Sequence, residues 1–95
     1  MSTLHLMNRS PFTSQVTAEL EAALSSGDHI LLIEDGVYAV LAGKKLFSTA
    51  DAHVGVLLED CQARGITLTA DMPQAVDMAG FVRLTAETER IVSWF

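Results

Sequence analysis

The sequence predicts a small α/β fold: a mostly parallel sheet of about four to five strands with helices on both faces. Short apolar runs alternate with amphipathic stretches along the whole chain, which is the pattern of right-handed strand–helix–strand units. The run from His29 to Ile33 is continuously apolar, as expected of a strand that is buried on both faces of a parallel sheet. The chain has 95 residues, a usual domain size, so we expect one domain over residues 1–95.

Five segments are predicted to be strands because they are short, apolar and bounded by turn residues. They are Thr3–Met7, His29–Ile33, Val54–Leu58, Gln74–Val76 and Ile91–Phe95.

The first predicted helix follows a turn, with Ser10 as its N-cap and Pro11 at its first position. Gly27 suits the left-handed residue that follows a helix end. One face of this helix collects its apolar side chains, namely Phe12, Val16, Leu20, Ala23 and Leu24.

Three further helices are predicted, over Val37–Ala42, Glu59–Arg64 and Met78–Ala86. Gly43 and Gly65 are expected to end the first two, and Asp77 to cap the third. Lys44–Asp51 is expected to be a loop or an extended connection. The core-facing stripe of the third helix is predicted to consist of Met78, Phe81, Val82 and Leu84-Thr85.

The composition excludes several classes of protein. Hydrophobic residues make up 49% of the chain and the mean hydropathy is +0.31, which argues against intrinsic disorder. The longest clean apolar run, Ile30–Ile33, is too short for a membrane span. No signal peptide is visible, so a cytoplasmic location is expected. The net charge of −6 argues against direct binding of nucleic acid, and the apolar surplus predicts contact with another subunit.

Cys61 is the single cysteine, so no internal disulfide can form, as is usual in a reducing cytoplasm. It lies at the start of a predicted helix, a place that can activate a thiol. Its neighbours Glu59 and Asp60 oppose this by disfavouring a thiolate. A buried structural cysteine is the favoured interpretation, and a redox or sulfur-handling thiol is the alternative.

No metal or cofactor site is predicted. The histidines His5, His29 and His53 lack the spacing of metal ligands, and the glycines form no phosphate-binding loop. Glu34 and Asp35 follow a strand end, where α/β proteins place ligands, although turn formation is the favoured role. The aromatic pair Trp94-Phe95 is expected either to pack in the core or to insert into a partner, and core packing is favoured.

The chain resembles the TusB/DsrH family over nearly its whole length. Each motif is weak alone, but five occur in the family's order. They are LHLMNRSPF at Leu4–Phe12, the strand and turn at Asp28–Gly36, EDCQARGI at Glu59–Ile66, DMAGFVRLT at Asp77–Thr85, and the tryptophan strand Val92–Trp94.

This resemblance implies a DsrE/DsrF/DsrH-type fold and a place in a sulfur relay. In the TusB branch, the protein assembles with TusC and TusD into a heterohexamer. That complex takes persulfide sulfur from a TusA-type carrier and passes it to TusE, toward 2-thiouridine at the tRNA wobble position. The reacting cysteine belongs chiefly to the TusD/DsrE-type subunit, and some DsrH-like members carry another cysteine in the first helix.

This chain has no cysteine in Pro11–Ser26, and the family register puts Leu20 near that place. The difference favours the TusB branch and a non-catalytic role. The resemblance implies TusC-like and TusD-like partners, no cofactor is expected, and the apolar surplus favours self-association of the isolated chain. Cys61 falls at a variable position of its motif and inherits no role from the family. The positions expected at a partner interface are Asp35, Gly36, Glu59, Asp60, Arg64, Trp94 and Phe95.

Two other functions remain open. One is a DsrH-like subunit of sulfur oxidation in which Cys61 carries a persulfide. The other is a standalone homo-oligomeric interaction module unrelated to tRNA.

Overall fold

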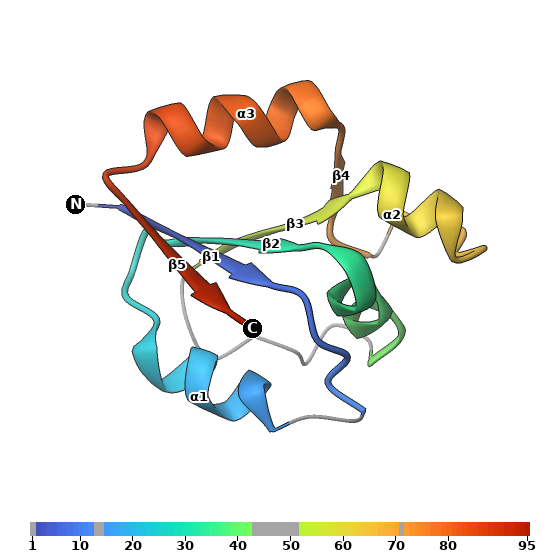
Figure 1. The fold of residues 1–95 in the computed structure, drawn as a ribbon, viewed down its shortest axis with the longest axis horizontal. Helices are drawn as coiled ribbons and strands as arrows, with labels where there is room; N and C mark the ends of the chain where they lie inside the picture. The colour runs from blue at the N-terminus through green and yellow to red at the C-terminus, as the bar shows by residue number, and fades with distance from the viewer. Residues whose placement is uncertain (1, 13–14, 43–51, 71) are drawn as a thin grey trace.

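The protein forms one five-stranded parallel sheet with helices on both sides (Figure 1). A computed structural model describes residues 2–12, 15–42, 52–70 and 72–95. The elements in chain order are β1 (Thr3–Met7), α1 (Val16–Ala23), β2 (His29–Leu32), η1 (Glu34–Ala42, a 3-10 helix), β3 (His53–Leu57), α2 (Leu58–Ala63), β4 (Gln74–Val76), α3 (Met78–Glu87) and β5 (Arg90–Trp94).

The sheet has the order β4-β3-β2-β1-β5. The chain therefore steps outward from β1 to β4 and returns to place β5 on the other side of β1. All four strand pairs are parallel, which confirms the predicted fold class. Every predicted strand is present, and each boundary lies within one residue of its prediction.

Alternate residues of the central strands feed two hydrophobic clusters, one on each face of the sheet. On one face, α1, η1 and α2 pack over Met7, Ile30 and Leu32. On the opposite face, Leu4, Leu6 and Leu31 lie beneath Phe81 and Leu84 of α3. Figure 1 shows α1 and α3 on opposite sides of the strands. Burial of β1 and β2 on both faces explains their continuous apolar sequence.

The predicted start of the first helix is wrong. The helix begins at Val16, and its N-cap residue Gln15 makes no side-chain cap. Ser10 instead closes a local turn, because its Oγ accepts a hydrogen bond from the Phe12 amide at 3.2 Å. Phe12 is consequently 63% exposed and outside the core stripe, whereas Val16 and Leu20 are buried.

Gly27 has the expected left-handed backbone, with φ of +84°. However, α1 has already ended at Ala23, so Gly27 belongs to the turn before β2, where the Asp28 amide donates to the Ser25 carbonyl. The predicted Val37–Ala42 helix is part of η1, which begins earlier, at Glu34. Gly43 and the Lys44–Asp51 connection lie outside the described residues.

Helix α2 ends as predicted at Gly65, which has φ of +68°. The Gly65 amide donates to the Gln62 carbonyl, and the Ile66 amide donates to the Cys61 carbonyl. This pair of bonds is the Schellman arrangement that satisfies the last carbonyls of a helix.

Helix α3 begins as predicted at the Asp77 cap, where Asp77 Oδ1 accepts from the Gly80 amide at 2.8 Å. Its predicted core stripe is only half correct. Phe81 and Leu84 pack on the sheet, whereas Met78 and Val82 are 49% and 61% exposed. The error arises because α3 has apolar side chains on more than one of its sides. The sequence alone therefore does not show which side faces the sheet.

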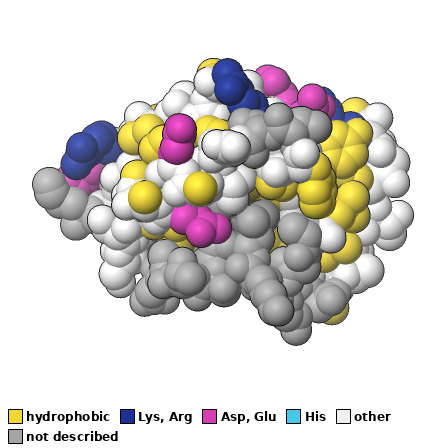
Figure 2. Space-filling view, turned by 90° about the horizontal axis from the view of Figure 1, so that it is seen from below, with side chains coloured by type: hydrophobic (Ala, Val, Ile, Leu, Met, Phe, Trp, Pro, Cys, Tyr) yellow, Lys and Arg dark blue, Asp and Glu magenta, His cyan; other side chains and the backbone are white. Residues whose placement is uncertain are grey.

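Exposed apolar side chains also occur on the side of the molecule that carries α1. Figure 2 shows this side, where hydrophobic side chains gather toward the right of the view. Within the described residues, no helix is long and apolar enough to cross a membrane.

Candidate functional site

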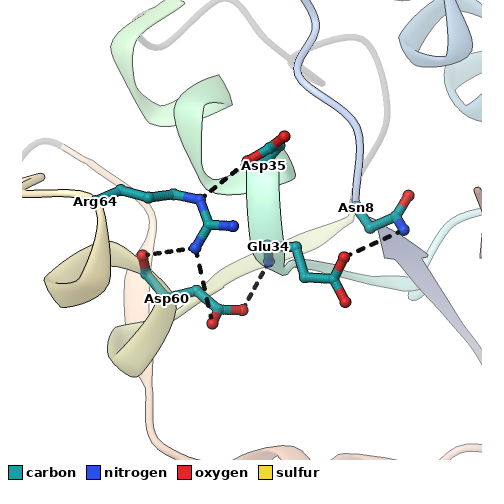
Figure 3. Close-up of polar contacts among 5 residues, drawn as sticks. All are labelled: Asn8, Glu34, Asp35, Asp60 and Arg64. Atoms are coloured by element: carbon teal, nitrogen blue, oxygen red, sulfur yellow. Dashed lines mark hydrogen bonds and ion pairs between the residues drawn. The ribbon is translucent and has the colours of Figure 1, made fainter.

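Polar side chains meet at the carboxyl ends of three neighbouring strands, where α/β proteins place their ligands. Asn8 follows β1, Glu34 follows β2, and Asp60 lies in α2 directly after β3. Asn8 Nδ2 lies 3.5 Å from Glu34 Oε2, and the Glu34 amide donates to Asp60 Oδ2 at 2.7 Å (Figure 3). These contacts join the three strand ends into one network.

Glu34 has an unusual backbone conformation, with φ of +49°. This left-handed region is unfavourable for residues that carry a Cβ atom. The short bond from its amide to the Asp60 carboxylate holds the backbone in this conformation. The turn from β2 into η1 is therefore fixed by a side chain of α2.

Arg64 joins the predicted interface residues to one another. Its Nε donates to Asp35 Oδ1 at 3.1 Å, and its Nη1 donates to the Asp60 carbonyl at 3.3 Å (Figure 3). Nη1 also lies 4.0 Å from Asp60 Oδ1. The structure thus brings Asp35, Asp60 and Arg64 together at the surface.

Gly36 is buried rather than presented to solvent. A Cβ atom at this position would collide with the Met7 carbonyl, so the start of η1 packs directly against the end of β1. Gly36 therefore allows the backbone beneath the network to pack closely, because it has no side chain. Glu59, in contrast, is exposed, and its Oε2 accepts a hydrogen bond from the Met78 amide at 3.1 Å. Glu59 thus links α2 to the first turn of α3.

Cys61 lies beneath this network, with its side chain in the hydrophobic cluster on the α1 side. It is fully buried. Burial raises the pKa of the thiol, the Asp60 carboxylate raises it further, and Arg64 partly opposes them. A buried thiol with a raised pKa is a poor nucleophile, because the thiolate is the reactive form.

Trp94 is held by a hydrogen bond to the buried pair of His5 and Asp28, which the sequence did not predict. Its Nε1 donates to His5 Nδ1 at 3.0 Å, and His5 Nε2 lies 2.9 Å from Asp28 Oδ2. Because an indole nitrogen only donates, His5 Nδ1 accepts and the proton on Nε2 is directed at Asp28. Trp94 is half-buried against the α1-side cluster, whereas Phe95 is 57% exposed.

Asp28 connects several elements. Burial alone would raise its pKa, but hydrogen bonds from His5 and from the Ser25 and Thr3 amides outweigh burial, and its pKa is lowered. The two amides donate at 3.0 and 3.2 Å. The only sequence signal for this residue was its place after Gly27 and before a buried strand.

A hollow of about 340 Å³ lies where the direction of strand addition reverses, between β1 and β5. Arg9, Glu19, Ser93, Trp94 and Phe95 are among its lining residues. Its one cationic and one anionic side chain favour neither sign of charge in a ligand.

The three histidines make contacts other than metal coordination among the residues that the structure describes. His29 and His53 stack at 5.1 Å between ring centroids, and His5 is committed to Asp28 and Trp94. Within residues 2–12, 15–42, 52–70 and 72–95, no group of three or more His, Cys, Asp or Glu residues could hold a metal ion.

Known proteins resemble this chain in both sequence and fold. A family model described as "DsrH like protein" matches residues 9–91. Protein TusB of Escherichia coli O81 (strain ED1a) is 36% identical over 96 residues, covering 96% of this chain and 99% of the relative. Protein TusB of Shigella flexneri is 37% identical over 97 residues, with the same coverage.

The solution NMR structure of protein Tm0979 from Thermotoga maritima superposes with a TM-score of 0.68. It is 22% identical in sequence, and the match covers 88% of this chain and 91% of that chain. This structure supports the fold, and the sequence matches establish the family. The chain belongs to the TusB/DsrH family.

Proposed function

We propose that this chain is a non-catalytic subunit of a cytoplasmic sulfur-relay complex, with TusC-like and TusD-like partners. The complex passes persulfide sulfur toward 2-thiolation of the tRNA wobble uridine. Family membership and nearly full-length similarity to TusB proteins support this proposal.

The burial of Cys61 is the observation that carries the non-catalytic role. Sulfur transfer requires a thiolate that attacks a sulfane sulfur and displaces the donor thiolate. The only thiol of this chain is buried and has a raised pKa. The attacking thiolate therefore belongs to a partner subunit, and this chain supports or positions that partner.

The carboxyl edge of the sheet is the surface that we propose for this partner. Asp35 and Glu59 are exposed there, and Asp60 and Arg64 are half-exposed beside them. Trp94 and Phe95 lie at the end of β5 on the same edge. Gly36 contributes by shaping the backbone beneath this surface, since it is itself buried.

Removal of the thiol tests the proposal. The variants Cys61→Ala and Cys61→Ser are introduced into the complete complex, and 2-thiouridine in tRNA is measured by mass spectrometry of nucleosides. We expect thiolation at the wild-type level in both variants. A loss of thiolation while the complex still assembles would overturn the non-catalytic role.

Two further measurements separate the alternatives. After incubation with a persulfide donor, mass spectrometry should find no added sulfur atom on Cys61, and such an adduct would favour a persulfide-carrying role. Co-purification should recover TusC-like and TusD-like subunits. A chain that binds neither would contradict the relay proposal.

A further inference from the structure

Trp94 is held at the carboxyl edge of the sheet by a side chain that can change its charge. It pairs in register with Met7, the last residue of β1, and its indole Nε1 donates to His5 Nδ1 at 3.0 Å. The two ring centroids are 6.1 Å apart, so the rings approach through their nitrogen edges rather than through their faces. The position of the indole therefore depends on one lone pair of His5.

The other ring nitrogen of His5 is held independently of Trp94. Nε2 lies 2.9 Å from Asp28 Oδ2, and the Asp28 carboxylate is itself fixed by the amides of Ser25 and Thr3. A carboxylate accepts from Nε2–H whether the imidazole is neutral or protonated, and the bond is stronger when the ring is charged. Gain of a proton therefore leaves His5 in place and changes only the side that faces the indole.

Protonation of His5 is incompatible with the bond from Trp94. A neutral imidazole has one nitrogen that accepts, but both nitrogens of an imidazolium donate. Nδ1–H and the indole N–H would then face each other across 3.0 Å. His5 is only 2% exposed, and a buried charged donor without an acceptor is costly. The indole therefore has to move aside so that water or another acceptor can reach Nδ1.

The structure provides space for this movement. Trp94 is half-buried and lines the hollow of about 340 Å³ beside the end of β5, together with Arg9, Glu19 and Phe95. Strand β5 lies at an edge of the sheet, next to β1 (Figure 1). A displaced indole can therefore exchange its bond to His5 for water in this hollow while β5 stays paired with β1.

The charged side chains on the elements around His5 are of both signs. Asp28 contacts it from the turn before β2. Arg90 is exposed at the start of β5 and lies two residues before the strand partner of His5, so it is on the same face of the sheet. Helix α1, which packs over this face, carries Glu19 and Glu21. The pKa of Asp28 is lowered, so this contact keeps its negative charge throughout the pH range in which histidine changes charge.

We propose that His5 is a pH-sensitive switch for Trp94: its neutral imidazole holds the indole at the carboxyl edge of the sheet, and its protonated form releases the indole into the adjoining hollow. One proton passes from water to Nδ1, and no covalent bond of the chain breaks. The switch is a property of this chain and does not require the relay. Its consequence for partner binding, namely two different surfaces at the end of β5, rests on the proposed function.

Trp94 is the single tryptophan of the chain, so its fluorescence tests the proposal. From about pH 8 to about pH 5, we expect quenching of this fluorescence by acrylamide to increase about twofold or more, while far-ultraviolet circular dichroism stays constant. The increase should be absent in His5→Asn, whose side-chain oxygen can accept from the indole but does not titrate. His29→Asn and His53→Asn are the matched controls, because they remove the other two histidines, and both should keep the increase.

Several outcomes would overturn the proposal. They are quenching that does not change with pH, a change that persists in His5→Asn, a change that is lost in the control variants, and a change that accompanies loss of the circular dichroism signal.

Nuclear magnetic resonance of the wild-type chain gives a measurement that needs no variant. At about pH 8 the nitrogen chemical shifts of His5 should show the tautomer with its proton on Nε2. The single indole N–H resonance should then shift together with the protonation of His5. A proton on Nδ1 at the higher pH, or an indole resonance that ignores this protonation, would contradict the switch. Neither measurement uses a partner or sulfur transfer, so failure of the switch leaves the relay proposal untouched.

Discussion

Cys61 illustrates at the scale of one residue how burial decides chemistry. Its pKa is raised by burial and by Asp60, against the opposing effect of Arg64, so its thiolate fraction near neutral pH is smaller than that of an exposed cysteine. We expect a disulfide reagent to modify Cys61 at least about tenfold more slowly in the native chain than in the chain unfolded in urea. Leu41→Cys in a Cys61→Ala background supplies an exposed thiol for comparison. Equal rates for Cys61 and this exposed thiol would contradict the structure.

Glu34 makes a second prediction from its backbone alone. A left-handed conformation costs a residue with a Cβ atom about 1–2 kcal/mol, and glycine avoids this cost. Glycine also loses more conformational entropy on folding than other residues, which offsets part of the stabilisation. Glu34 at φ of +49° should therefore gain about 0.5 kcal/mol of folding stability in Glu34→Gly. Glu19→Gly, at an exposed position within α1, should instead lose about 1 kcal/mol. Urea denaturation of the two variants gives the signs, and a destabilised Glu34→Gly would refute the assigned strain.

At the scale of the element, α2 depends on the left-handed residue that ends it. Gly65 has φ of +68°, and open space surrounds the position of a Cβ atom there. Gly65→Ala should therefore destabilise the protein by about 1 kcal/mol through backbone conformation alone. Gln62→Ala, at an exposed position of the same helix, should change the free energy of unfolding little. If thermal and urea unfolding show no difference between the two variants, the helix does not need its left-handed end.

The elements that the sequence predicted correctly are those with a local signal. Apolar runs between turn residues located all five strands. Asp77 marked the start of α3 through its side-chain cap, and Gly65 marked the end of α2 through its backbone bond. The start of α1 was missed because Ser10-Pro11 is equally suited to a turn, and Ser10 bonds Phe12 in that turn. The exposed side of α3 was missed because the helix has apolar residues on several sides, so the sequence does not show which of these residues pack on the sheet.

The candidate site was less predictable, because its contacts join segments far apart in the chain. The positions of Asp35 and Asp60 shortly after strand ends, and of Arg64 at the end of the helix that follows, could be predicted from the sequence. The bonds from Glu34 to Asp60 and from Trp94 to His5 could not, because they depend on the order and register of the parallel strands. At the scale of the molecule, that order also leaves β5 at an edge and covers one face of the sheet with α3.

Asp28 connects more of the molecule than any local signal suggested. Its carboxylate accepts bonds from Thr3 in β1, from Ser25 after α1 and from buried His5, while its carbonyl accepts from the His53 amide that begins β3. Because the pKa of Asp28 is lowered in the folded chain, this carboxyl group binds fewer protons in the folded state than in the unfolded state at the same pH. Its contribution to stability is therefore complete above the ordinary carboxyl pKa of about 4 and is lost as the pH falls through the lowered value.

The variant Asp28→Asn tests this linkage while keeping the shape of the side chain. We expect it to lower the free energy of unfolding at pH 7 by about 1–3 kcal/mol, because a charged acceptor of several buried bonds is replaced by a neutral amide. The difference from wild type should shrink as the pH is lowered below the ordinary carboxyl pKa of about 4 and through the lowered pKa of Asp28, because the wild-type carboxyl then becomes protonated. Asp35→Asn, at an exposed carboxylate of the network, should show a much smaller effect. Urea denaturation of the three chains across this pH range measures both trends. A difference for Asp28→Asn that stays constant with pH would show that the ionised carboxylate does not stabilise the fold.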